Sequence, residues 1–147
     1  HGDGSSLWTM THNSDFARGF IGLLGNIQSI WHAFHITSDE VLTWDQIYQA
    51  IAKAAGVEAN IVHIATDFII SQLPEKKGSL LGDKAVSCVF DNSKIKHYVP
   101  TYKAKIPFIS GIKQTIDWFR ASPERCTVDQ EWNRKIDHVI NSYKTKL

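Results

Sequence analysis

The chain has 147 residues, of which 43% are hydrophobic and 21% charged, as in one ordinary globular domain covering residues 1–147. Sixteen lysines and arginines are balanced by fifteen acidic residues without forming a basic stripe, so we expect no nucleic-acid partner. No apolar run approaches the roughly 20 residues that span a bilayer, so we expect no membrane insertion.

The cysteines and the first residues bear on where the chain comes from. Cys88 and Cys126 have neither the number nor the spacing of a disulfide framework or a zinc site, so we expect reduced thiols and a cytoplasmic protein. The chain opens with His1 and Gly2, without an initiator methionine or a signal-peptide pattern. We therefore expect a longer parent protein, with removal of a signal or a tag as the alternatives.

The N-terminal part predicts a strand at residues 7–11, followed by an amphipathic helix at residues 13–25. Asn13, Ser14 and Asp15 offer N-cap oxygens at the start of this helix. Four side chains at helical spacing share its expected buried face: Phe16, Phe20, Ile21 and Leu24.

The strongest helix pattern covers residues 44–55. Thr43 and Gln46 form a capping box at its start, and Gly56 has the position of a C-cap. Its apolar side chains recur every three or four residues: Trp44, Ile47, Tyr48, Ile51, Ala52 and Ala55. Further strands are predicted at three places: residues 33–37, 60–64 and 86–90.

The remaining helices are marked by caps and prolines. One helix is predicted at residues 67–72, before Pro74, and a second is capped by Asp91 and runs through Tyr98. A third begins at Pro107 and ends at Ser122 and Pro123, and the last begins at a capping box of Thr127 and Gln130. The polar, glycine-punctuated residues 75–82 predict a mobile loop over a pocket or partner. The expected fold is a helix-rich α/β or α+β unit with short strands.

Three glycines have the spacing of a nucleotide-binding fingerprint: Gly19, Gly22 and Gly25. That fingerprint needs a strand directly before it and a helix that starts on it, so that helix N-terminal amides meet the pyrophosphate. Here the glycines lie inside and at the end of the predicted helix. We therefore interpret them as places of close packing, and we expect no cofactor to bind this chain alone.

Other candidate sites are weaker. His32 and His35 resemble half of a metal site, but no third ligand has a suitable spacing, and we interpret His35 as a partly buried structural residue of a strand. No Gly-x-Ser-x-Gly elbow is present, and Cys88 lies in an apolar run. Three lysines flank the predicted loop and offer an anion contact or a solvated surface: Lys76, Lys77 and Lys84.

A series of short sequence motifs extends along nearly the whole chain: Gly2-Asp3-Gly4, His12, Ser14-Asp15-Phe16-Ala17, residues 33–37 and 43–46, Gly82-Asp83, and residues 90–95, 106–108, 111–112 and 117–119. Their order resembles the C-terminal part of the extended short-chain dehydrogenase/reductase family, in particular NAD-dependent epimerase/dehydratase-like proteins. The resemblance implies a substrate-binding portion that lacks its N-terminal Rossmann half. That half would bind NAD or NADP and carry the catalytic Tyr-x-x-x-Lys pair, so the chain alone is expected to be inactive.

The resemblance also implies substrate-binding positions at Trp8, Leu80, Gly82 and Asp83. Nucleotide-sugar members of the family usually have arginines where Trp8 and Leu80 stand, and these grip the diphosphate. Their replacement argues against a nucleoside-diphosphate sugar and favours a smaller or less charged substrate. Both side chains are equally well interpreted as core residues.

A second hypothesis is a non-enzymatic module that binds a small molecule or assembles with other chains. Without a Rossmann half, apolar helix faces and strand edges would be uncovered, and such surfaces favour self-association. We therefore expect the isolated chain to form a homo-oligomer.

Overall fold

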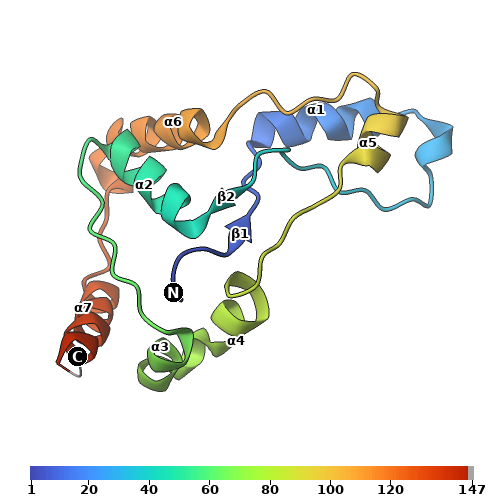
Figure 1. Cartoon of the computed structure of the whole chain (residues 1–147). Helices are drawn as coiled ribbons and strands as arrows, with labels where there is room; N and C mark the ends of the chain where they lie inside the picture. The colour runs from blue at the N-terminus through green and yellow to red at the C-terminus, as the bar shows by residue number, and fades with distance from the viewer. Residues whose placement is uncertain (146–147) are drawn as a thin grey trace.

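A computed structural model describes residues 1–145 and contains two short strands and seven α-helices within them (Figure 1). The helices are α1 Asn13–Leu23, α2 Trp44–Ala55, α3 Thr66–Gln72, α4 Lys77–Ser79, α5 Ser93–Tyr98, α6 Phe108–Arg120 and α7 Gln130–Lys144. Strands β1 Leu7–Trp8 and β2 Leu42–Thr43 pair antiparallel, with Leu7 opposite Thr43 and Trp8 opposite Leu42. The coarse prediction of a helix-rich α/β or α+β fold is thereby confirmed. No helix within residues 1–145 is both long and apolar enough to cross a membrane.

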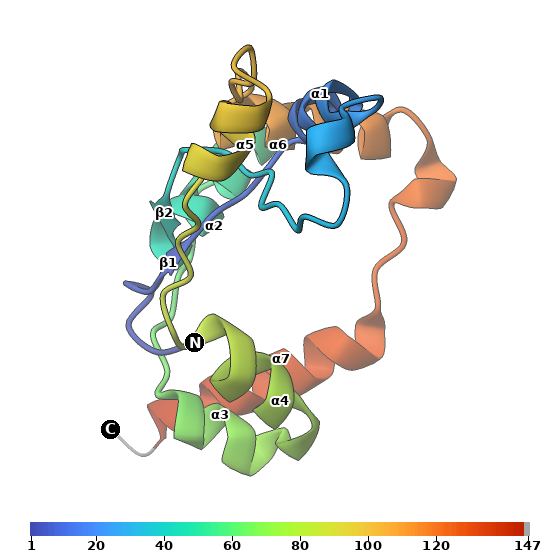
Figure 2. The same cartoon turned by 90° about the vertical axis from the view of Figure 1, so that its right-hand side faces the viewer.

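The elements gather at two ends of the molecule. Helices α1, α5 and α6 lie at one end and α3, α4 and α7 at the other, with α2 and the strands adjoining the first group (Figures 1 and 2). Each group has a small core of its own. The first core consists of Ile36, Ile95, Val99 and Tyr102, and the second of Ile64, Leu73 and Val139.

The chain exposes an unusually large surface. Its accessible area is 9906 Å², whereas a compact monomer of this mass would expose about 7,600 Å². Part of the excess lies on and just after α1, where the predicted buried face is wrong, since the four side chains predicted for it are 48 to 64% exposed: Phe16, Phe20, Ile21 and Leu24. The buried residues of α1 are instead Asp15 and Gly19. Nothing within the described residues covers the apolar face of this helix.

The glycines of α1 bring it close to its neighbours. A Cβ added to Gly19 would collide with Ile36 and come within 2.9 Å of the Tyr102 ring, and one added to Gly22 would collide with Val99. The predicted packing role of these two glycines is therefore confirmed. Burial raises the pKa of Tyr102, whose hydroxyl donates a 2.9 Å hydrogen bond to the Thr37 carbonyl.

Three of the predicted strands are wrong, because the segments at residues 33–37, 60–64 and 86–90 are not strands. Strands need a continuous ladder of backbone hydrogen bonds, and these segments make only isolated ones. Ile64 forms a single bridge with Gly2, and the Cys88 N–H donates one 2.9 Å hydrogen bond to the Leu7 carbonyl. Their apolar residues favour an extended backbone, but the described residues supply no continuous partner strand.

Two further local predictions are also wrong. The predicted loop at residues 75–82 is a series of helical turns: η2 Pro74–Lys76, α4, and the π-helical η3 Leu80–Lys84. Helix α7 begins at Gln130, and its cap is Asp129, whose carboxylate accepts a 2.9 Å hydrogen bond from the Trp132 N–H. The expected capping box at Thr127 therefore does not form, because a carboxylate nearer to the helix takes its place.

The capping box of α2 is confirmed and supports a quantitative prediction. The Thr43 hydroxyl accepts a hydrogen bond from the Gln46 N–H at 3.2 Å, and the Gln46 side chain accepts one from the Thr43 N–H at 2.9 Å. We expect Thr43→Ala to lower the free energy of unfolding by about 1 kcal/mol in urea titrations followed by circular dichroism. Thr43→Ser keeps the acceptor and is the control. Equal losses in the two variants would contradict the role of the hydroxyl.

Candidate functional site

The four residues predicted for substrate binding lie on two neighbouring parts of the chain. Trp8 is half-buried on β1, with its ring centroid 5.6 Å from that of Trp44. Leu80 is buried at the start of η3, while Gly82 and Asp83 are exposed in the same helical turn. Trp8 and Leu80 therefore contribute to packing, and the exposed pair is accessible to a ligand.

Three hydrogen bonds join β1 to the segment that follows Asp83. The Ser6 hydroxyl donates to the Lys84 carbonyl at 2.9 Å, and the Leu7 N–H donates to the Ser87 hydroxyl at 2.9 Å. The third bond, from the Cys88 N–H to the Leu7 carbonyl, extends this connection by one residue. The structure thus brings the strand of Trp8 beside the region of Gly82 and Asp83, although the two are far apart in sequence.

The weaker candidates are engaged in local contacts. Lys84 pairs with Asp83 at 2.8 Å, and the Lys76 ammonium lies 4.1 Å from the centre of the Trp132 ring. His35 is exposed, in contrast to the prediction of a partly buried residue in a strand, and its ring centroid lies 4.8 Å from that of Phe90. Within residues 1–145, no three histidine, cysteine or acidic side chains gather as a metal site requires.

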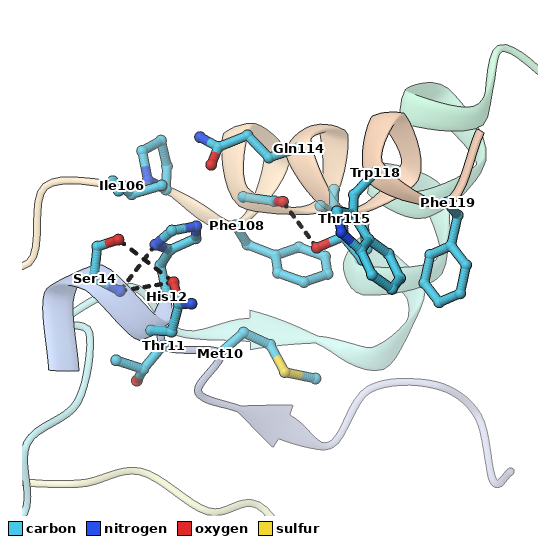
Figure 3. Close-up of a pocket in the computed structure, with 14 residues that line it drawn as sticks. Met10, Thr11, His12, Ser14, Ile106, Phe108, Gln114, Thr115, Trp118 and Phe119 are labelled. Atoms are coloured by element: carbon cyan, nitrogen blue, oxygen red, sulfur yellow. Dashed lines mark hydrogen bonds between the residues drawn. The ribbon is translucent and has the colours of Figure 1, made fainter. Parts of the chain in front are cut away.

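A cavity of about 680 Å³ lies between the start of α1 and α6 (Figure 3). His12 and Ser14 line it on the α1 side, and Phe108, Thr115 and Trp118 line it from α6. Its volume falls within the range of small-molecule sites, about 300 to 1,000 Å³. None of the residues that line it is an aspartate, glutamate, lysine or arginine.

Acidic side chains outside the cavity hold its walls in place. The buried Asp15 carboxylate accepts hydrogen bonds from the backbone N–H groups of Lys105 at 3.0 Å and Ile106 at 2.9 Å. Glu40 accepts a 2.7 Å hydrogen bond from the Phe108 N–H, one of the four N–H groups that the start of a helix leaves unpaired. The two carboxylates therefore fix the segment that leads into α6 and the first turn of that helix.

Gly111 lets α6 approach the start of α1. A Cβ at this buried position would lie 2.9 Å from the His12 ring, closer than side chains normally pack. The His12 ring also accepts a hydrogen bond at Nδ1 from the Ser14 N–H at 3.2 Å. In the neutral ring this acceptor role places the proton on Nε2, so His12 has a free N–H donor.

A second cavity, of about 480 Å³, lies among α2, α3 and α7. Its lining is largely apolar and includes Trp44, Tyr48 and Val139. At its edge the His63 ring and the Asp45 carboxylate bind each other at 2.9 Å. This polar pair is already satisfied, whereas two other nitrogens on the lining, His1 Nε2 and Trp44 Nε1, are buried without a hydrogen-bond partner among the described residues.

The residues of the cavity beside α6 were not predicted from the sequence. One signal was available: Phe108, Gly111, Thr115 and Trp118 recur at helical spacing without a charge, while Lys113 and Asp117 lie between them. No family model, curated protein or solved structure matches this chain.

Proposed function

We propose that the chain is the substrate-binding, C-terminal portion of an NAD(P)-dependent protein similar to epimerases and dehydratases of the extended short-chain dehydrogenase/reductase family. The observation that carries the proposal is the exposed apolar face of α1, in a chain whose motif order resembles that of this family. Stacked phenylalanine rings, with centroids 6.1 Å apart at Phe16 and Phe20, form part of that face. A face of this kind indicates a missing partner.

The size of the uncovered surface supports a partner as large as a domain. The chain exposes about 2,300 Å² more than a compact monomer would, whereas each side of a standard protein interface buries about 800 Å². The extended segment at residues 33–37 also has no partner strand within residues 1–145. In the proposal, the upstream Rossmann half covers both.

The roles proposed for the upstream half and for this chain follow from the residues that this chain contains. None of its four tyrosines is followed by a lysine four residues later, so the catalytic pair would lie upstream. NAD or NADP would bind to the upstream half and supply the hydride chemistry. The residues of this chain would bind and orient the substrate, with Gly82 and Asp83 accessible beside β1. Trp8 and Leu80 provide no guanidinium group for a diphosphate, which favours a smaller or less charged substrate.

The test is the complete reading frame of the parent and the protein expressed from it. We expect about 150 or more residues before His1, with a glycine-rich fingerprint after a strand and a Tyr-x-x-x-Lys pair. The longer protein should bind NADH or NADPH in fluorescence titrations, and the 147-residue chain should bind neither. A reading frame that starts near His1, or a longer protein that binds neither nucleotide, would reject the proposal.

The second candidate function is an assembly module, and the same exposed face favours it. We predict that the isolated chain forms dimers or larger oligomers in light scattering, because association would cover Phe20 and Leu24. Phe20→Asp combined with Leu24→Asp should give a monomer, because each carboxylate would have to be desolvated in the contact. Lys113→Asp, at an exposed position of α6, is the control and should leave the oligomer intact. A monodisperse wild-type monomer would refute this prediction.

A further inference from the structure

The cavity beside α6 combines aromatic walls with polar side chains, none of which is a lysine, an arginine or a carboxylate. We propose that it binds an uncharged aromatic compound bearing a carbonyl group. Phe108 and Trp118 supply the aromatic surface, and His12, Ser14 and Gln114 supply hydrogen-bonding groups (Figure 3). The inference concerns this chain alone and does not depend on the proposed Rossmann half. Trp8 and Leu80 do not line the cavity, so it is separate from those two positions.

The Trp118 ring of the aromatic wall is held by contacts with Arg125 and Phe119. The Arg125 guanidinium lies 4.1 Å from the centre of the Trp118 ring, and its Nη1 donates a 3.0 Å hydrogen bond to the Trp118 carbonyl. The Phe119 ring meets that of Trp118 edge to face, with centroids 5.0 Å apart. A planar ring is the ligand shape that such a surface favours, because aromatic pairs add attraction beyond area burial.

The polar groups of the cavity favour a hydrogen-bond acceptor on the ligand. His12 has its free donor at Nε2, because Nδ1 is occupied by the Ser14 N–H. The Gln114 amide is a further donor on the same lining, whereas the Ser14 hydroxyl donates to Asn13 Oδ1 at 3.4 Å. The Thr115 hydroxyl donates to the Gly111 carbonyl at 3.2 Å and so presents lone pairs instead. A carbonyl or carboxamide oxygen complements the donors of His12 and Gln114.

The residues of the lining, which include no lysine, arginine or carboxylate, argue against two other classes of ligand. A carboxylate or phosphate would lose part of its hydration without meeting a lysine or arginine on the lining, which makes binding costly. Sugars would meet the aromatic wall, but hydroxyl groups that face the apolar side chains of the lining, such as Ile106, Phe108 and Ile112, would lose their hydration without a hydrogen-bond partner. An aromatic carbonyl compound satisfies the donors and leaves few of its own polar atoms unpaired.

The experiment uses the 147-residue chain labelled with ¹⁵N and benzamide as the probe. The five tryptophans give five indole N–H signals, and the signal missing from Trp118→Ala identifies Trp118. We expect saturable shifts of this indole signal and of the His12 ring nitrogens. Benzoate, which adds a charge, and methyl glucoside, which lacks an aromatic ring, should each bind at least about tenfold more weakly.

Two tryptophan variants form a matched pair. Trp118→Ala should weaken benzamide binding about fivefold or more, whereas Trp31→Ala, at a fully exposed position outside the cavity, should leave it unchanged. If Trp118→Ala does not fold, Thr115→Leu provides the same test by filling the cavity from the middle of α6. Unshifted His12 and Trp118 signals, equal affinities in the matched pair, or tighter binding of benzoate or methyl glucoside would overturn the proposal.

Discussion

Replacing Asp15 with alanine is expected to lower the free energy of unfolding by about 3 kcal/mol. Asp15 has no exposed surface, and its carboxylate accepts hydrogen bonds from Lys105, Ile106 and Arg18. Alanine would leave two backbone N–H groups and a guanidinium without their acceptor. Since these bonds join α1 to the segment before α6, the loss affects the junction that forms the cavity.

Urea titrations followed by circular dichroism measure this effect, and two variants define its origin. Asp15→Asn keeps the shape and one acceptor oxygen but turns an N–H₂ group toward a donor, so we expect a loss of about 2 kcal/mol. Asp117→Ala removes an exposed carboxylate that pairs with Lys113 at 3.1 Å, and its loss should stay below about 1 kcal/mol. A loss in Asp15→Ala no larger than in Asp117→Ala would show that the buried hydrogen bonds do not stabilise the fold.

Helices α1 and α2 show how far the sequence predicts this fold. Both were predicted from apolar spacing and caps, and both form close to the expected bounds. In α2 the predicted stripe includes the buried Trp44 and Ile47, because neighbouring elements of the same chain cover it. The stripe of α1 is exposed. Spacing predicts that a helix has an apolar face, but what covers that face depends on elements elsewhere.

The strands were harder to predict for the same physical reason. An apolar, β-branched segment such as residues 33–37 favours an extended backbone, but a strand also requires a neighbour with free N–H and C=O groups. The backbone N–H and C=O of Thr37 bond instead to the Asn92 side chain. Side-chain bonds of this kind connect residues 55 positions apart, and no local pattern indicates them.

The cavity beside α6 was not predicted, since its parts come from separate segments. His12 stands before α1, Phe108 begins α6, and Asp15 and Glu40 hold the backbone between them in place. The sequence resemblance implied that Trp8 and Leu80 bind substrate, whereas in the structure both side chains pack against other residues. A group of neutral side chains becomes recognisable as a site only when folding encloses a volume around it.

Replacing Asn92 with alanine is expected to cost about 3 kcal/mol of unfolding free energy. The Asn92 side chain is 5% exposed and forms hydrogen bonds with the turn at residues 37–39. Its Oδ1 accepts from the Thr37 N–H at 3.3 Å and the Thr37 hydroxyl at 3.0 Å, while its Nδ2 donates to the carbonyls of Thr37 and Ser38. Nδ2 also donates to Asp39 at 3.1 Å. Asn133→Ala, at an exposed position of α7, is the control and should be nearly neutral.

The pH dependence of Asn92→Asp separates lost hydrogen bonds from added charge. In the native chain, hydrogen bonds from Lys96 and Asn92 lower the pKa of Asp39, so its stabilising contribution is present at neutral pH and is lost as pH falls below about 4. In Asn92→Asp the new carboxylate would face Asp39 and two carbonyl oxygens, which raises its own pKa in the folded state. The stability deficit of this variant relative to the native chain should therefore shrink on acidification from pH 7 to pH 4, while that of Asn92→Ala should not. Urea titrations at the two pH values measure the difference, and parallel behaviour of the variants would contradict a direct contact between residues 92 and 39.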